Sequence, residues 1–190
     1  MNNYSFFWGK PTKIIEKLPD LSIEEKGLLI KNYKGPWIAG GAAIKFFQTG
    51  SFDGAKDIDI FFKSERHFDD WSISFLSLPG TKVIQRPPAY SLSNFVIEYE
   101  GFEFNLIAFN FCRTPYETIE DFDFTVCRIF TDGKRIIADK RALDHIRSKT
   151  LSFYKKENIK KEKIDERIRK YIGKGFTPDK EMTEWMLANL

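Results

Sequence analysis

The stretch from Trp37 to Phe62, WIAGGAAIKFFQTGSFDGAKDIDIFF, decides the fold of this chain. It predicts a strand, a tight turn at Gly40-Gly41, a short helix, a loop and a second strand. The second strand carries Asp57 and Asp59, and side chains two residues apart on a strand point to the same face. The isoleucines that follow each aspartate then face a core, so this strand presents a pair of carboxylates to whatever lies opposite.

Two neighbouring carboxylates repel each other unless a positive charge lies between them. Mg²⁺ suits oxygen ligands and usually reaches a protein together with the phosphates of a substrate. Gly40 and Gly41 allow backbone N–H groups to approach a ligand closely, and the N-terminus of a helix follows them. These features together predict a site for a metal-bound triphosphate, with Asp57 and Asp59 as the metal ligands.

The order of Gly-Gly, short helix and DIDIFF resembles the nucleotidyltransferase superfamily that includes DNA polymerase β. Its spacing is most similar to the head domain of tRNA CCA-adding enzymes and bacterial poly(A) polymerases, and it also resembles nucleotidyltransferase toxins of abortive-infection systems. A D-x-D pair alone is a weak signal, but a Gly-Gly pair at this distance before it is more specific. The resemblance implies an α+β fold, in which helices flank a mixed or antiparallel sheet and a basic helical segment follows.

Later segments resemble motifs of the CCA-adding head and occur in the same order. Asp123, Phe124 and Thr125 match D-F-T in the motif R-R-D-F-T-x-N-A, whereas Asp121 and Phe122 stand at its arginines and Cys127 at its asparagine. Residues 142–151 partly match G-L-x-D-L-x-x-K-x-L. The run from Asp165 to Arg169 resembles E-D-x-x-R with its first two letters exchanged.

This resemblance implies a role for each matched residue. Asp57 and Asp59 would hold Mg²⁺ for catalysis, and Glu103 or Asn105 would correspond to a third acidic residue on a neighbouring strand. Gly40 and Gly41 would bind the triphosphate, with Lys45 in place of the family's phosphate-binding arginine. The remaining nucleotide contacts would come from Asp123, Asp165 and Arg169. A solvated strand face accounts equally well for Glu103 and Asn105. An acidic helix-to-strand junction is the alternative for Asp121 and Asp123, and the context favours it less than the motif.

The implied activity is Mg²⁺-dependent transfer of NMP from an NTP to a hydroxyl acceptor, with the 3′ end of a tRNA-like RNA as first choice. Two alternatives stay open: a toxin-type transferase that modifies tRNA or protein, and a non-catalytic relative that binds nucleotide or RNA. The altered arginines favour the non-catalytic relative, whereas the intact Gly-Gly and D-x-D favour an enzyme. By analogy, so compact a form would suit a bacteriophage or mobile-element genome.

Composition divides the chain into two parts. With 190 residues, 42% of them hydrophobic, we expect a nucleotidyltransferase domain over 1–150 and a helical appendage over 151–190. The net charge is +3, but residues 155–174 hold nine basic and four acidic side chains, which gives +5 there and −2 elsewhere. This asymmetry predicts a basic helix that gathers a polyanion. We expect its buried stripe to contain Ile159, Ile164, Ile168 and Ile172.

Other features indicate a cytoplasmic protein that does not enter a membrane. Cys112 and Cys127 are too few for a disulfide framework and lack metal-binding spacing, so we expect two reduced core residues. No apolar run approaches transmembrane length. We further expect a short helix from Thr12 to Lys17 and a last helix whose Trp185, Met186 and Leu187 pack on the body. The oligomeric state is not predicted.

Overall fold

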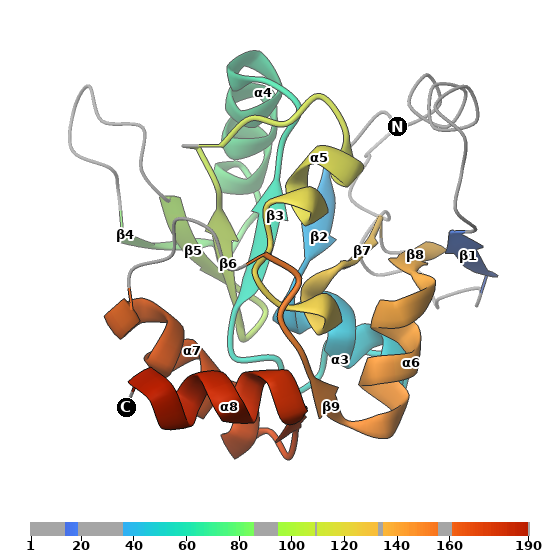
Figure 1. Ribbon diagram of the computed structural model, residues 1–190. Coiled ribbons are helices and arrows are strands. Elements are labelled where there is room, and N and C mark those ends of the chain that lie inside the picture. Colours follow the sequence, from blue (N-terminus) through green and yellow to red (C-terminus); the bar gives the residue numbers. More distant parts are fainter. Residues whose placement is uncertain are drawn as a thin grey trace.

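One mixed sheet forms the centre of the fold. The computed structural model describes residues 14–18, 36–85, 95–108, 110–132, 135–155 and 161–189. In sheet order, the strands within these ranges are β1 (Ile14–Leu18), β8 (Arg135–Asp139), β7 (Ile129–Thr131), β2 (Trp37–Ala39), β3 (Ile58–Phe61), β6 (Phe102–Leu106), β5 (Phe95–Tyr99) and β4 (Lys82–Gln85). The β1–β8 and β3–β6 pairs are parallel and the other neighbouring pairs are antiparallel. Figure 1 shows β1 and β4 at opposite edges, and the expected α+β class is confirmed.

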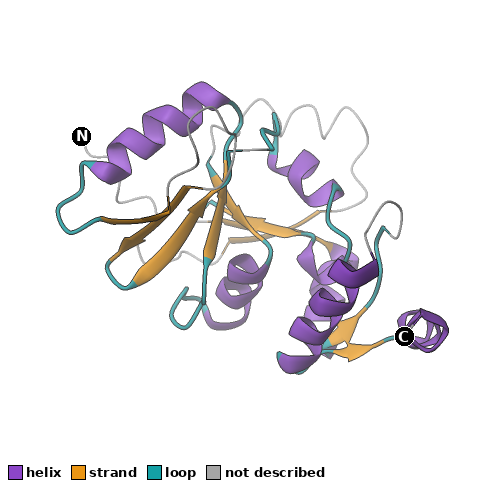
Figure 2. Ribbon diagram, turned by 90° about the vertical axis from the view of Figure 1, so that its left-hand side faces the viewer, coloured by secondary structure: helices purple, strands orange, loops and turns teal. Residues whose placement is uncertain are grey.

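Helices cover both faces of this sheet (Figure 2). They are α3 (Gly41–Thr49), α4 (Glu65–Leu76), α5 (Pro115–Glu120), α6 (Lys140–Ser148), α7 (Lys161–Gly173) and α8 (Lys180–Asn189). Three of them begin at a capping side chain that accepts a hydrogen bond from a backbone N–H of the first turn: Ser64 for α4, Thr114 for α5 and Asp139 for α6. A short 3₁₀ turn, η1 (Thr125–Cys127), leads into β7.

The central strands are buried on both sides, because their alternate residues enter two different clusters. Ile38, Ile58 and Ile60 belong to the cluster that includes residues of α3 and α6. Trp37 and Phe61 point the other way, into the cluster that α5 covers. The indole Nε1 of Trp37 donates to Thr118 Oγ1 at 3.1 Å, which attaches α5 to β2. Double-sided burial fixes the register of β2 and β3, and therefore the position of the turn between β2 and α3.

The C-terminal segment packs on the same core as the sheet. A two-stranded parallel pair, β9 (Thr150–Leu151) and β10 (Thr177–Pro178), brackets α7, and α8 follows it. Ile164, Ile168 and Tyr171 of α7 are buried in the cluster that also holds the central strands. Figure 1 places α7 and α8 together beside β9. The described part of 151–190 thus continues the core of the domain, while the expected domain boundary at 150 stays a prediction.

Three expectations about local structure are wrong. Residues 14–18 form β1 rather than a helix, because β-branched Ile14 and Ile15 extend the sheet by parallel pairing with β8. Ile172 is 41% exposed, and Tyr171 takes its place in the stripe of α7. Leu187 is 83% exposed, although Trp185 packs edge-to-face on Phe153. The expected burial of Ile159 concerns a residue outside the described ranges.

The contrast between Ile168 and Ile172 allows a matched test of how α7 contributes to stability. Both isoleucines lie on one helix, but Ile168 is fully buried and Ile172 is largely exposed. We expect Ile168→Ala to lower the free energy of unfolding by about 2–5 kcal/mol. Ile172→Ala should lower it by about 1 kcal/mol or less. Urea unfolding of the two variants checks this, and equal losses would contradict the packing of α7 on the core.

Candidate functional site: two carboxylates facing a basic helix

The Gly-Gly turn holds the start of α3 open toward a ligand. Gly40 has φ of 70°, a conformation that residues with a side chain rarely adopt. A Cβ added to Gly41 would lie 3.4 Å from Lys174 Nζ, which shows that this lysine reaches the turn. The first turn of α3 carries no acidic residue, and its backbone N–H groups and helix dipole therefore favour an anion.

Asp57 and Asp59 lie beside this turn, on the face of β3 opposite Ile58 and Ile60. Asp57 immediately precedes the strand, and Asp59 is half-buried within it. Asn105 of β6 is in register with Asp59 and donates its Nδ2–H to Asp59 Oδ1 at 3.0 Å. Within the described ranges, neither aspartate forms an ion pair. Carboxylate oxygens are thus free to bind a cation.

The environment of Asp59 disfavours its charged form. Burial raises the pKa of Asp59 above its ordinary value, and the nearby charge of Asp57 adds to this rise. The hydrogen bond from Asn105 lowers the pKa, as do the charges of Lys170 and Arg167, but these effects do not offset burial. A bound cation would stabilise the ionised carboxylate at this position.

The donor set fits Mg²⁺ with part of its coordination supplied from outside the protein. Two carboxylates are hard oxygen ligands of the kind that Mg²⁺ binds. No cluster of three or more His, Cys, Asp or Glu side chains among the described residues is arranged to hold a metal ion. Substrate phosphates and water would therefore complete the coordination, as is usual for this ion.

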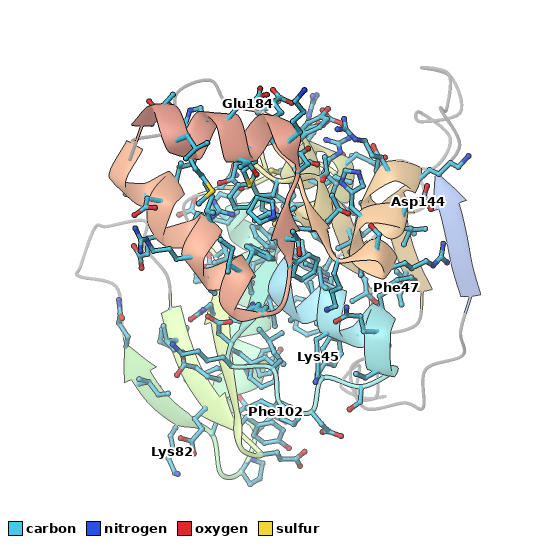
Figure 3. The ribbon with its side chains drawn as sticks, turned by 60° about the horizontal axis from the view of Figure 1, so that its bottom comes forward. Lys45, Phe47, Lys82, Phe102, Asp144 and Glu184 are labelled. Atoms are coloured by element: carbon cyan, nitrogen blue, oxygen red, sulfur yellow. The ribbon has the colours of Figure 1, made fainter. Side chains whose placement is uncertain are left out.

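A cavity of about 320 Å³ next to Asp57 is strongly basic. Five lysine side chains line it, against the single carboxylate of Asp57: Lys45, Lys56, Lys149, Lys170 and Lys174. None of these lysines pairs with an acidic residue in the described part of the chain. Burial lowers the pKa of Lys174, and the neighbouring charge of Lys170 lowers it further. Figure 3 shows Lys45 on α3, next to the loop before β3. The cavity is suited to a multivalent anion.

A second cavity, of about 560 Å³, extends past Asp59. It shares Gly41, Asp57, two α7 residues and Lys174 with the first cavity, so the two form one continuous cleft. One face of α7, continued by Lys174 just after its end, forms its wall: Lys163, Glu166, Arg167, Lys170, Tyr171 and Lys174. These positions recur every three or four residues and therefore lie on one side of the helix.

Asp123 attaches α7 to the rest of the site. It is 3% exposed, and Nη2 of Arg167 lies 2.9 Å from its Oδ1. Among the described residues, neither carboxylate oxygen of Asp123 has a partner at hydrogen-bonding geometry, so the contact with Arg167 is an ion pair without an aligned hydrogen bond. Burial raises the pKa of Asp123, and the charge of Arg167 opposes the rise. The D-F-T segment thus positions the basic face of α7 over the cleft.

The structure brings together some of the residues that the sequence indicated. The cleft contains Gly40, Gly41, Lys45, Asp57 and Asp59, with Asp123 next to it. Three others lie apart from the cavity linings. Glu103 is exposed and lies opposite Glu98 on β5, while Asp165 and Arg169 pair with each other at 2.9 Å along α7.

The basic segment expected over 155–174 supplies one wall of the cleft, but the individual basic residues that line the cleft there were not among the predicted site residues. Lys163, Arg167, Lys170 and Lys174 follow a spacing of four, three and four, which is the period of one helix face and was visible in the sequence. Lys56 and Lys149 carried no such pattern, because they come from two loops that only the fold brings together. Cys112 and Cys127 are free and buried, as expected.

Comparison with known proteins gives a family and a fold. A family model described as "Gad2: Gabija anti-defense 2 family protein" matches residues 12–149. No curated protein matches the chain. Among the described residues, no helix combines the length and apolar character that crossing a membrane requires.

Two solved structures resemble this chain. One is the Bacillus stearothermophilus CCA-adding enzyme in complex with CTP, at 19% identity and a TM-score of 0.43, over 62% of this chain and 29% of that one. The other is a tRNA-processing enzyme in an apo form, at 11% identity and a TM-score of 0.50, over 78% of this chain and 43% of that one. The chain therefore spans less than half the length of either. The second likeness shows that this chain shares its fold with that tRNA-processing enzyme, and it extends no further than the fold.

The raised pKa of Asp59 gives a stability prediction with a defined sign. Its folded-state pKa exceeds the unfolded value, so ionisation destabilises the fold. The destabilisation by ionised Asp59 is absent when the pH is below the ordinary aspartate pKa. It is fully present when the pH exceeds the pKa of Asp59 in the folded protein. In metal-free buffer, Asp59→Asn should therefore raise Tm at neutral pH, with a gain that shrinks as the pH falls.

The matched control is Asp53→Asn, an exposed aspartate in the loop before β3, which should leave Tm unchanged. Thermal unfolding from neutral to acidic pH in the presence of a chelator measures both variants. A loss of Tm in Asp59→Asn at neutral pH would contradict the assigned environment of Asp59.

Proposed function

The chain belongs to the Gabija anti-defense 2 family, and we propose that it works there as a Mg²⁺-dependent nucleotidyltransferase. It transfers NMP from an NTP to a hydroxyl acceptor, with an RNA 3′ end as the preferred acceptor. The transfer would be the means by which the protein acts against defence. A toxin-type transferase that modifies tRNA or protein uses the same chemistry and differs only in its acceptor.

One observation carries the proposal: in the described part of the chain, Asp57 and Asp59 form no ion pair, at the point where a helix N-terminus meets a basic cavity. Two carboxylates without a cationic partner, one of them lining a cavity with five lysines, are the environment expected for a metal-bound polyphosphate. Either group alone would be unfavourable, because the carboxylates repel each other and so do the lysines. A triphosphate with its cation relieves both repulsions together.

Each part of the cleft then has a task. Asp57 and Asp59 bind Mg²⁺, which would neutralise charge on the phosphates and lower the pKa of the attacking hydroxyl. Gly40 and Gly41 offer backbone N–H groups to the β- and γ-phosphates, and Lys45 and the other cavity lysines stabilise the leaving pyrophosphate. The acceptor oxygen forms a bond to the α-phosphorus, the bond to pyrophosphate breaks, and the hydroxyl proton passes to water.

The basic face of α7 supports a nucleic-acid acceptor. Lys163 and Arg167 are exposed at the larger cavity, on the side away from the lysine-rich one. Because the attacking and leaving oxygens are roughly in line in phosphoryl transfer, the acceptor enters from this larger cavity. Cationic side chains along its wall would bind the backbone phosphates of a single strand.

A specific observation favours the second candidate, a non-catalytic protein that binds nucleotide or RNA. The residue in register with Asp59 on β6 is Asn105, an amide where a third carboxylate could have stood. Glu103 is exposed and outside the cavity lining, and in the proposed enzyme it would have to turn toward Asp57 to serve as a third acidic ligand.

Transfer of radioactive label distinguishes these two functions. The purified protein is incubated with Mg²⁺, each of the four α-labelled NTPs, and total cellular RNA and protein. We expect label on an RNA band, and a loss of at least about a hundredfold in Asp57→Ala, because the metal ligand is gone. Asp53→Ala is the matched control, and circular dichroism of all three proteins verifies the fold.

Label that persists in Asp57→Ala would contradict the proposed role of this carboxylate. Label on protein rather than RNA would identify the toxin-type acceptor. A folded protein that binds NTP but transfers no label would establish the non-catalytic alternative.

The lysine-rich cavity predicts binding of a triphosphate without a nucleoside. Inorganic triphosphate with Mg²⁺, measured by calorimetry, should bind the unmodified protein and bind about tenfold more weakly after Lys45→Ala, since a charge-assisted contact is lost. Lys149→Ala should behave similarly. Lys180→Ala on exposed α8 is the matched control and should bind like the unmodified protein. Equal affinities in all four proteins would exclude this cavity as the triphosphate site.

A further inference from the structure

The part of the cleft outside the lysine-rich cavity has an aromatic wall. The larger cavity is lined there by Phe61, Ile107 and Phe122. Phe61 is only 8% exposed, whereas Phe122 is half-buried and offers part of its ring to the cavity. The two rings meet edge-to-face, with centroids 6.3 Å apart and planes at 70°. Phe122 also packs against both core clusters, so its ring is held in a fixed orientation.

The two ends of the cleft differ in charge as well as in polarity. The smaller cavity has five lysines and one aspartate. Among the described residues that line the larger cavity, four are acidic and four are basic, so their charges balance. Such a cleft matches a ligand with phosphates at one end and an uncharged, flat group at the other. An NTP has its charged phosphates at one end and its flat base at the other. If its α-phosphate lies at Asp57 and Asp59, its base then reaches the aromatic wall.

The residue types at this wall support the same orientation of the nucleotide in the cleft. In the R-R-D-F-T-x-N-A motif that this segment resembles, an arginine occupies the position of Phe122. Here the guanidinium beside Asp123 comes instead from Arg167 of α7. With phenylalanine at position 122, an apolar ring faces the cavity. An arginine at this position would instead bind phosphate or carboxylate groups. A ring in this place is suited to stacking.

We propose that Phe122 is the platform on which the base of the incoming nucleotide stacks, with Phe61 holding its ring in place. This inference rests on the proposed function, because it takes the triphosphate to lie in the lysine-rich cavity. Stacking tolerates every base, since each has a π face, and it strengthens with the size of the ring system. The protein therefore accepts all four NTPs and prefers purines to pyrimidines.

Nucleotide binding tests the platform without relying on catalysis. Calorimetry in Mg²⁺ compares ATP, CTP and inorganic triphosphate on the unmodified protein and on Phe122→Leu, which keeps an apolar side chain and removes the ring. We expect Phe122→Leu to weaken ATP binding about tenfold, to weaken CTP binding less, and to leave triphosphate binding unchanged. Phe122→Tyr should bind ATP like the unmodified protein. Phe47→Leu, on α3 and outside both cavity linings, is the matched control.

A second variant gives a readout that does not depend on loss of binding. In Phe122→Trp the new indole lies at the proposed platform, and ATP should quench its fluorescence whereas inorganic triphosphate should not. If ATP binds but Phe122→Leu keeps full affinity, or if ATP does not quench Phe122→Trp, the platform is wrong and the triphosphate site stands. If neither ATP nor inorganic triphosphate binds, the nucleotide site itself is wrong, and the proposed function fails with it.

Discussion

The cleft depends on charges that are held close together without being paired. Asp57 and Asp59 are fixed by the register of β3 between β2 and β6, and the cavity lysines are fixed by α3, α7 and the loops around them. Burial raises the pKa of Asp59 and lowers the pKa of Lys174, and each shift favours the neutral form of the side chain. A fold selected only for stability would pair these groups with each other. Their separation supports the proposed ligand, which carries both a cation and several phosphates.

The helix α7 connects the fold to the site. Its apolar side, with Ile164, Ile168 and Tyr171, packs on the sheet's core, and the adjacent side lines the cleft. Arg167 links that side to the buried Asp123, and the Tyr171 hydroxyl lies 3.0 Å from Cys127 Sγ. The same residues that stabilise the C-terminal segment therefore set the position of the cationic wall. This is why the acidic and basic parts of the chain, far apart in sequence, meet across one cleft.

The family match and the likeness to solved structures give different kinds of information about this protein. The Gabija anti-defense 2 match covers β1 through α6, including the Gly-Gly turn and both aspartates, but it ends before α7. The likeness to a tRNA-processing enzyme gives the arrangement of strands and helices. The proposed function and the proposed base platform rest on particular side chains of this cleft, among them Asn105 opposite Asp59 and Phe122 in the wall of the larger cavity.

The sequence by itself determined the unit from Trp37 to Phe62, because alternation along a strand and a Gly-Gly turn are local properties. It also determined the caps of α4, α5 and α6, which depend on residues within one helical turn. Only the tertiary structure decided that residues 14–18 pair with β8, that Tyr171 rather than Ile172 is buried, and that Lys56 and Lys149 share a cavity. Those outcomes depend on contacts between segments distant in the chain, and such contacts leave no periodic signal in either segment alone.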